Sequence, residues 1–434
     1  MNELEQLRVE LQYGKTNKCV QCGYCLPVCP TYVTMGKETH SPRGRINLIK
    51  MVGEGKITDL SLLEEPLDLC LGCRACETAC PTGVEYGSIL ESARAAITKR
   101  RRLSVTSKVL KRTFLRKIFP SRKMMHLIGN SIWVYQKSGV QNAVRKFHIT
   151  NKLPYHLGDF EATVTESMSP KERRQFQKYM KARGERKYTV AFFTGCIMDA
   201  MFARVNQLSV ELLAYVGCDV TVVEGQTCCG ALHAHAGELE QARWLAKRNI
   251  VAFEHLNVDF VVNNAGGCGA MLYEYDHLLE DEKDWHERAK KFVSKSTDIS
   301  KVLSLCGGVP FTQQLGNRVE RVTYQPSCHL TNVQRIIEEP LELLKSVPNA
   351  KLIALQSPDT CCGSAGIYNI VHYDESMDIL NRKMEDVKEV QPTIIVTSNP
   401  GCLIQMKLGI EREKLKNIRA LHLVEYLAEA AGIS

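Results

Sequence analysis

Two cysteine runs near the N-terminus constrain this chain more than any other feature. Each run has the form C-x-x-C-x-x-C-x-x-x-C followed by proline. Together they supply eight cysteines: Cys19, Cys22, Cys25, Cys29, Cys70, Cys73, Cys76 and Cys80. Eight thiolates at this spacing are typical of two [4Fe–4S] clusters, in which the last cysteine of a run ligates the other cluster. The runs therefore predict a compact domain built around two clusters that carry single electrons.

The spacing also predicts which cysteines share a cluster. The first three cysteines of one run wrap one cluster, and the fourth lies too far along the chain to close it. The predicted set for cluster 1 is Cys19, Cys22, Cys25 and Cys80. The predicted set for cluster 2 is Cys29, Cys70, Cys73 and Cys76. Two zinc sites are the alternative, but zinc sites use paired C-x-x-C units rather than a doubled run ending in Cys-Pro.

Length and composition indicate a soluble globular protein. A chain of 434 residues is long enough for two to four domains. No apolar stretch approaches the roughly 18 residues that a membrane helix needs, and the polar start MNELEQLRVELQYGK does not resemble a secretory signal. We therefore expect a cytoplasmic protein. In a reducing compartment its eighteen cysteines are metal ligands, reactive thiols or buried small residues rather than a disulfide framework.

The net charge of +8 comes from one segment. Residues 99–123 hold eleven Lys or Arg and no acid, and the rest of the chain has 45 basic against 48 acidic residues. Leu110, Phe114 and Ile118 recur every four residues among these cations, which predicts an amphipathic helix. Three interpretations stay open: docking on an acidic partner subunit, peripheral contact with anionic lipid on the inner face of the cytoplasmic membrane, or a solvated surface. Nucleic acid is not an expected partner, because no binding fold accompanies the charge.

From about residue 188 onward the chain repeats itself. Each repeat contains a single cysteine, then Cys-Cys-Gly, then Gly-Cys, and corresponding cysteines are offset by 132 to 134 residues. The eight cysteines concerned are Cys196, Cys228, Cys229, Cys268, Cys328, Cys361, Cys362 and Cys402. Agreement over so many positions indicates a duplication.

Each repeated cysteine follows a short apolar segment. The predicted strands are 189–193, 219–223 and 259–262 in the first repeat and 321–324, 351–355 and 393–397 in the second, with helical patterns between them. Alternating strands and helices predict parallel β-α-β units, whose sites lie beyond the carboxyl ends of the strands. The predicted fold is thus a mainly helical two-cluster ferredoxin domain (1–98), a basic helical connector (99–187) and two duplicated α/β domains (188–310 and 311–434).

The repeated cysteines are predicted to form one metal or redox site per repeat. The alternative is that they are buried small residues at a sheet edge. Adjacent cysteines rarely form a disulfide with each other, because the geometry strains the backbone. Cys218 and Cys306 lie outside both patterns and are predicted to be core or loop residues.

Several other polar residues accompany the cysteine motifs. His233, His235 and His329 follow cysteines, and we weigh a proton-carrying role against a local hydrogen-bonding role. Arg43 and Arg45, after the helix start at Ser41-Pro42, either balance the charge of the clusters or lie on a solvated helix face.

No catalytic machinery for organic substrates is visible. The chain has neither G-x-G-x-x-G after a strand nor G-x-x-x-x-G-K-[ST], and so lacks a recognisable dinucleotide or nucleotide cradle. No catalytic residue is assigned. We expect any organic oxidation to occur on another polypeptide, so this chain alone is not expected to be catalytic.

Five segments together carry a family resemblance. HSPRGRI at 40–46, LDLCLGCRACETACPTGVEYG at 67–87, CCGALHAH at 228–235, CCGSAGIY at 361–368 and the doubled cysteine run resemble the iron–sulfur subunit of bacterial glycolate oxidase over essentially the whole chain. The resemblance implies a hetero-oligomer with flavin-binding subunits, where FAD lies on the partners and glycolate is oxidised to glyoxylate. This chain would pass the electrons through two [4Fe–4S] clusters to a membrane acceptor such as quinone.

Related subunits provide the alternatives. Iron–sulfur subunits of lactate-utilisation and glycerol-3-phosphate dehydrogenase systems, and of heterodisulfide reductase, share the paired Cys-Cys-Gly repeats. In the heterodisulfide-reductase pattern the last cysteine opens a C-x-x-C pair, whereas this chain has Met271 and Gln405 at the matching positions. An additional iron–sulfur cluster in the repeats is therefore a hypothesis. So are thiol–disulfide catalysis at the Cys-Cys-Gly sites and a role limited to redox sensing or scaffolding.

Overall fold

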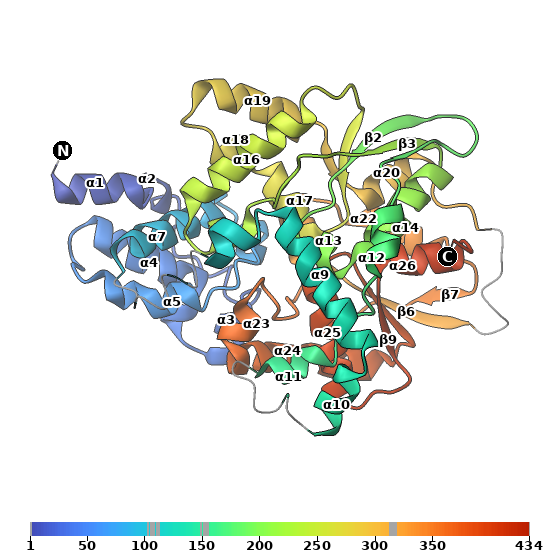
Figure 1. Cartoon of the computed structure of the whole chain (residues 1–434). Coiled ribbons are helices and arrows are strands. Elements are labelled where there is room, and N and C mark those ends of the chain that lie inside the picture. The colour runs from blue at the N-terminus through green and yellow to red at the C-terminus, as the bar shows by residue number, and fades with distance from the viewer. Residues whose placement is uncertain are drawn as a thin grey trace.

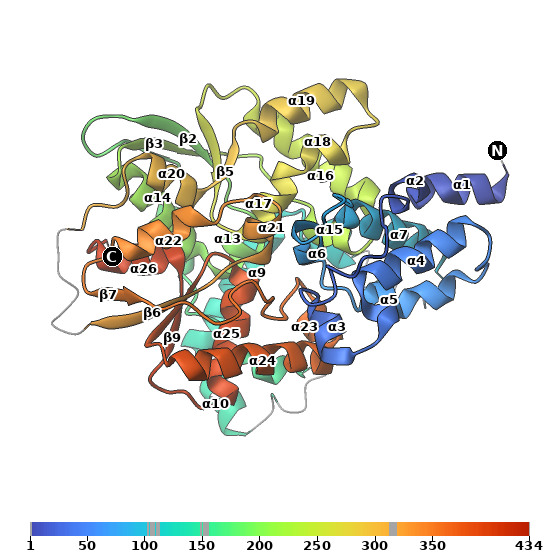
Figure 2. The same ribbon diagram turned by 180° about the vertical axis from the view of Figure 1, so that it is seen from behind.

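The computed structural model describes residues 2–101, 104, 109, 113–147, 150, 156–311 and 319–433. A helical N-terminal domain lies at one side of two α/β units, each of which is built on its own sheet (Figures 1 and 2). The mixed fold predicted from the sequence, a helical cluster domain followed by two α/β repeats with parallel sheets, is confirmed.

The N-terminal domain consists of short helices around the cysteine loops. Ser41 caps the longest one before the second run by accepting a hydrogen bond from the Gly44 N–H at 3.0 Å, and Pro42 occupies the first turn, as predicted. The elements are α1 (Glu3–Glu10), α2 (Tyr13–Thr16), α3 (Pro30–Met35), η1 (Glu38–His40), α4 (Pro42–Gly53), η2 (Leu60–Leu63), α5 (Glu64–Asp68), α6 (Ala75–Thr78) and α7 (Tyr86–Arg100).

A helical connector joins this domain to the sheets. It contains the π-helical turn η3 (Phe114–Ile118), α9 (Arg122–Lys137), α10 (Val140–Lys146), α11 (Leu157–Glu161) and α12 (Pro170–Gln175). Ser169 caps α12 in a capping box with Glu172, as the sequence predicted for a cap at this serine. The predicted helix through Leu110 lies in part outside the described residues, as do residues 102, 103, 105–108, 111 and 112 of the basic segment.

The first sheet has five strands in the order β1-β3-β2-β4-β5. All neighbouring pairs are parallel except β1 with β3. Its strands are β1 (Tyr179–Met180), β2 (Tyr188–Phe192), β3 (Cys218–Val222), β4 (Phe260–Asn263) and β5 (Ser296–Asp298). The helices of this unit are α13 (Ile197–Met201), α14 (Ala203–Tyr215), α15 (Ala231–His235), α16 (Leu239–Phe253), α17 (Gly266–Tyr273), α18 (Tyr275–Leu278), α19 (Lys283–Val293) and α20 (Ile299–Leu305).

The second sheet repeats this order with four parallel strands, β7-β6-β8-β9. Its strands are β6 (Glu320–Gln325), β7 (Ala350–Leu352), β8 (Ile394–Thr397) and β9 (Arg419–His422). Its helices are α21 (Cys328–Asn332), α22 (Glu338–Lys345), α23 (Tyr368–Val371), α24 (Tyr373–Val390), α25 (Pro400–Arg412) and α26 (Leu423–Ala430). The six predicted strands coincide with β2, β3, β4, β6, β7 and β8 to within a few residues. The sequence analysis missed β1, β5 and β9.

The two repeats share one hydrophobic core. Val190 and Phe192 of β2 point into a cluster that continues through α14 into the second sheet, where Val322 and Val396 belong to the same cluster. Ala191 and its neighbours on the other face of β2 pack instead under α16 and α19. Because burial of apolar area is continuous across the repeats, the two sheets are held as one body.

Within the described ranges, no helix combines the length and the apolarity required to cross a bilayer.

Two helical glycines give a test of the packing at the SPRGRI turn. A Cβ on Gly44 would lie 2.0 Å from the backbone oxygen of Glu38, whereas a Cβ on Gly14 would have no atom within 4 Å. We expect Gly44→Ala to lower the stability of the cluster domain by about 1–3 kcal/mol, since backbone has to move. Gly14→Ala is the matched control and should be neutral or stabilising. Thermal unfolding of both variants checks this, and equal melting temperatures would contradict it.

Candidate electron-transfer centres

The first centre lies at the outer edge of the N-terminal domain. Cys19, Cys22, Cys25 and Cys80 all line one small cavity of about 30 Å³. Two of these sulfurs accept hydrogen bonds. The Val84 backbone N–H donates to Cys80 Sγ at 3.5 Å, and the side-chain amide of Gln21 donates to Cys19 Sγ at 3.4 Å. Cys22 is exposed. This centre is therefore open to contact with another molecule at Cys22.

The second centre is buried. Cys29, Cys70 and Cys76 are buried and Cys73 is half-buried. Burial raises the pKa of the Cys76 thiol well above its ordinary value, and the charges of Cys73, Cys70 and Cys29 raise it further. Cys29 thus lies among the cysteines of the second run, and Cys80 lies among those of the first. This is the neighbourhood that the crossed ligand sets require, although the assignment of each ligand stays a prediction.

Buried arginine provides the opposite charge. The Arg45 side chain is 0 % exposed and donates to Pro66 O at 2.6 Å and to Thr31 Oγ1 at 3.0 Å. Burial lowers its pKa, but Cys70, Tyr86 and Cys29 together outweigh this effect and hold the pKa above its ordinary value. Of the two interpretations of Arg45, the solvated helix face is wrong. Arg43 lies on the partly exposed side and pairs with Glu38 at 2.7 Å.

The donor set fits two clusters. Eight thiols lie in two groups of four, and the sulfur of Cys70 accepts from the Gly72 N–H and the Tyr86 hydroxyl, both at 3.4 Å. Arg45 and Arg94 counter the charge of Cys70 and hold its pKa below the ordinary value despite burial. When bound, such clusters supply one-electron transfer. Among the described residues, no three or more Cys, His, Asp or Glu side chains are placed to hold a single metal ion.

The first repeat gathers its four cysteines at the carboxyl ends of β2, β3 and β4. Cys196 Sγ lies 3.3 Å from Cys228 Sγ, and Cys229 Sγ lies 3.4 Å from Cys268 Sγ. Cys268 is half-buried and the other three are buried. The Tyr275 hydroxyl donates to Cys229 O at 2.8 Å and fixes the loop. The four thiols of the first repeat therefore lie close together in two pairs.

The second repeat builds the same arrangement. Cys328 opens α21, Cys361 and Cys362 follow β7, and Cys402 lies in the first turn of α25. Hydrogen bonding to Cys361, together with burial, raises the pKa of Cys328 well above its ordinary value. Asn399 Nδ2 donates to Cys402 Sγ at 3.6 Å. The repeated cysteines of both units thus converge as the duplication predicted.

The second cluster centre contacts the second repeat directly. His329 Nε2 lies 3.0 Å from Gly72 O, and Asn332 Nδ2 donates to Cys73 O at 2.9 Å. Burial raises the pKa of Cys73 well above its ordinary value, with the charge of Cys328 the next largest cause. Helix α21 therefore docks on the loop of the second cysteine run and brings the two cysteine sets together.

The two repeats also meet at their cysteine loops. Asn399 Oδ1 accepts from the Gly267 N–H at 3.1 Å while the same side chain donates to Cys402 Sγ. Ser398 O accepts from the Gly266 N–H at 3.0 Å. One asparagine thus connects the loop of Cys268 to the thiol of Cys402.

The histidines hold interfaces between domains. His233 is buried, and its Nε2 lies 2.5 Å from Leu115 O of the connector. His235 Nδ1 lies 3.2 Å from Glu91, and its ring meets the ring of His329 edge to face at 5.5 Å between centroids. These contacts favour the local hydrogen-bonding role over proton transfer. Neither the cysteine motifs nor their spacing signalled that three domains meet here.

The two remaining cysteines form a pair that sequence reasoning did not foresee. Cys218 starts β3 and Cys306 follows α20, and their sulfurs lie 3.6 Å apart in the shared core. Both are buried, as predicted for core residues.

Comparisons with known proteins agree with this arrangement. Residues 15–84 match the family model of a 4Fe-4S dicluster domain, and residues 190–273 and 322–407 match that of a cysteine-rich domain. Residues 106–164 match the linker region of the glycolate oxidase iron-sulfur subunit. The fold and its cysteine centres define an iron–sulfur electron-transfer protein with a two-cluster domain and a duplicated cysteine-rich unit.

Relatives place the chain within that class. It is 47 % identical over 436 residues to a protein of Bacillus subtilis (strain 168) named probable glycolate oxidase iron-sulfur subunit, a match that covers 99 % of this chain and 98 % of that protein. The chain belongs to the glycolate oxidase iron–sulfur subunit family. The glycolate oxidase iron-sulfur subunit of Escherichia coli (strain K12) is 28 % identical, over 88 % of each chain. Lactate utilization protein A of Oceanobacillus iheyensis is 34 % identical over 55 % of this chain and 96 % of its own length.

Arg45 gives a test of charge balance at the second centre. Replacing it with Met removes the buried cation, so we expect the midpoint potential of the buried cluster to fall, since the reduced cluster carries more negative charge. Each 1.4 kcal/mol lost corresponds to about 60 mV for one electron. Redox titration followed by electron paramagnetic resonance measures the shift.

Arg45→Lys keeps the charge and should restore most of the potential. Arg43→Met is the matched control, because Arg43 is partly exposed and its charge is screened. An equal shift in both Met variants would contradict the role of Arg45.

Proposed function

We propose that this chain is the electron-transfer subunit of a flavin-dependent glycolate oxidase that converts glycolate to glyoxylate. Flavin-binding partner subunits oxidise the substrate. This chain takes the electrons one at a time and delivers them to a membrane acceptor such as quinone. The observation that carries the proposal is the continuous arrangement of cysteine centres, from exposed Cys22 through the buried second run to Cys328.

The proposed ligands follow the crossed pattern. Cys19, Cys22, Cys25 and Cys80 hold one [4Fe–4S] cluster, and Cys29, Cys70, Cys73 and Cys76 hold the other. We place the domain boundaries near residues 98, 187 and 310, as predicted from the sequence. The match of residues 15–84 to a dicluster domain and the placement of Cys29 and Cys80 support the crossed sets.

Electrons enter at the exposed centre. Val20 and Tyr24, on either side of Cys22, are 63 % and 67 % exposed. Apolar side chains around an exposed redox centre suit docking of another protein, because their burial drives association while the centre comes within reach. We assign this surface to the flavin-binding subunit.

The basic segment favours a position at the cytoplasmic face of the membrane. Phe114 of η3 is 43 % exposed beside Arg116 and Lys117, and Leu127 and Val134 of α9 are 57 % and 52 % exposed. Cations with exposed apolar side chains suit peripheral contact with anionic lipid or with an acidic partner subunit. Delivery of electrons to a membrane acceptor requires such proximity.

Reconstitution tests the division of labour. The isolated chain should not reduce a dye with glycolate, and activity should appear when the flavin subunits are added. Cys73→Ser should retain assembly with those subunits yet abolish electron flow to quinone, since one ligand of the buried cluster is lost. Glycolate-dependent dye reduction by this chain alone would refute the proposal. If the Cys73→Ser complex reduced quinone at an unimpaired rate, the clusters would have only a structural role.

Iron analysis tests the cysteine-rich repeats. We propose that Cys196, Cys228, Cys229 and Cys268, and the matching set Cys328, Cys361, Cys362 and Cys402, are metal or redox sites. Protein purified without oxygen should contain about eight iron per chain if only the N-terminal runs bind clusters, and about twelve or more if a repeat binds one as well. Cys362→Ser should remove only the iron above eight, and no change in that excess would exclude a cluster in the second repeat.

A further inference from the structure

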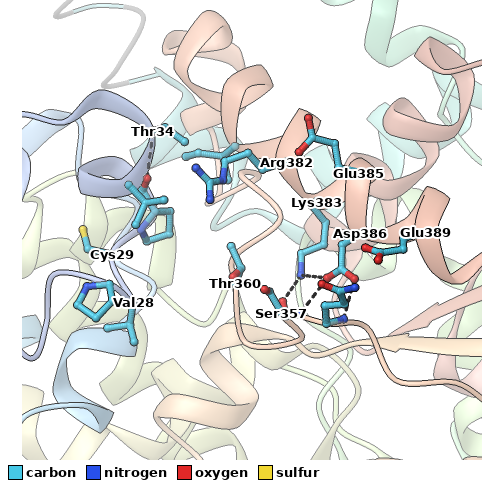
Figure 3. A pocket seen from close by; sticks show the side chains of 15 residues that line it. Val28, Cys29, Thr34, Ser357, Thr360, Arg382, Lys383, Glu385, Asp386 and Glu389 are labelled. Atoms are coloured by element: carbon cyan, nitrogen blue, oxygen red, sulfur yellow. Dashed lines mark hydrogen bonds and ion pairs between the residues drawn. The ribbon is translucent and has the colours of Figure 1, made fainter.

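A cavity of about 310 Å³ lies between the cluster domain and the second repeat. This volume is within the roughly 300–1,000 Å³ range of small-molecule sites. Figure 3 shows Val28 and Cys29 of the cluster domain on one side, Lys383 and Asp386 of α24 on the other, and Arg382 and Thr360 between them. The cavity is formed by two domains and open on one side.

One cysteine of the cluster domain lines this cavity, and the Cys-Cys-Gly loop of the second repeat begins beside it. Cys29, on one wall, is a proposed ligand of the buried cluster. Thr360, which lines the cavity between its two sides, directly precedes Cys361 of the second repeat. Cys361, Cys73 and Cys328 pack in one small apolar cluster, so the same junction connects both centres. A molecule bound here lies next to the inner end of the electron route.

The walls combine apolar surface with charged side chains of both signs. Pro27, Val28, Pro30, Val33 and Ile379 provide the apolar part. The Lys383 side chain is 1 % exposed, and its ammonium donates to Ser357 O at 2.5 Å and lies 3.9 Å from Asp386. Asp386 is already engaged, because it accepts the N–H groups of Gln356 and Ser357.

Arg382 is the cation free to meet a ligand. It is exposed at the cavity and, within the described ranges, makes no hydrogen bond or ion pair. An unpaired guanidinium beside an apolar wall fits a flat molecule that carries carbonyl oxygens, since it donates up to five hydrogen bonds while the wall packs on the ring.

We infer that this cavity binds the head group of a quinone, with its ring against Val28 and Val33 and a carbonyl oxygen facing Arg382. The inference rests on the proposed electron-transfer function, which it deepens by locating the acceptor. The two ends of the route differ in shape. Cys22 lies on an exposed surface that suits a protein partner, whereas Cys29 borders a recess that suits a small molecule.

The reaction at this site balances as quinone plus two electrons plus two protons giving quinol. The electrons arrive singly from the cluster beside Cys29, and both C=O groups become C–OH. No bond to the protein forms. Solvent supplies the protons, and Glu385 and Glu389, which line the cavity, are both exposed to it.

Re-oxidation of the full chain tests the inference. Protein with its clusters, reduced by dithionite, is mixed with a decyl benzoquinone at a concentration below saturation, and the visible absorbance of the clusters is followed. We expect Arg382→Ala to slow re-oxidation about tenfold, the effect of losing one charge-assisted hydrogen bond. Val33→Trp, which fills the cavity, should slow it at least as much. Lys388→Ala is the control, since Lys388 lies on the same helix and pairs with Glu413 away from the cavity.

Ferricyanide separates a cavity effect from damage to the clusters. This oxidant reaches the exposed centre at Cys22, so it should re-oxidise all four proteins at the same rate. Equilibrium dialysis should likewise show that the decyl benzoquinone binds about tenfold more weakly to Arg382→Ala than to Lys388→Ala. Equal quinone rates and equal binding in the cavity variants and the control would overturn the inference.

Because dithionite supplies the electrons, the outcome does not depend on glycolate or on the flavin subunits. If the chain fails to support glycolate oxidation but shows the Arg382 effect, the quinone site is supported and the proposed substrate is wrong. If the chain supports glycolate oxidation but does not show the Arg382 effect, the proposed function is supported and the quinone site is wrong.

Discussion

The docking of α21 on the second cysteine loop is the contact on which the proposed electron route depends. His329 and Asn332 bind the backbone oxygens of Gly72 and Cys73, so Cys328 is held beside the buried centre. Electron tunnelling is short-ranged, and a loop that moved away would break the path. Backbone oxygens on one side and buried side chains on the other make this contact independent of surface charge and therefore of salt.

Burial of so many thiolates requires compensation. A cluster with four thiolates is anionic, and transfer of charge into the interior is costly unless it is paired and hydrogen-bonded. Arg45 and Arg94 provide the positive charge, and Arg94 also donates to Leu67 O and Cys70 O. The same side chains thus lower the energy of the charged centre and fix the loop that carries it.

The sequence predicted the parts of this structure that depend on local pattern. The cap at Ser41, the duplication and six strands follow from spacing and periodicity within short windows. Arg45 was harder, because an arginine at the fourth position of a helix gives the same sequence pattern whether its side chain faces water or a thiolate. The sequence analysis missed β5 and β9 because polar residues such as Asp298 and His422 stand in them in place of an apolar run. The cavity at Arg382 involves residues some 350 positions apart, and no local pattern encodes such a meeting.

The packing of the cluster domain explains why the second repeat, and not its duplicate, lines the cavity of about 310 Å³. Both repeats present Cys-Cys-Gly at equivalent strand ends, yet the cluster domain packs its buried centre against Cys328 and leaves the first repeat to contact α7 through His235 and Glu91. The second copy lines the cavity of about 310 Å³, whereas the first copy lines a much smaller cavity of about 10 Å³ beside Gly72. The first copy is joined to the second through Asn399, which contacts both Gly267 and Cys402. Two copies of one sequence pattern thus have different surroundings, because a single neighbouring domain packs against them differently.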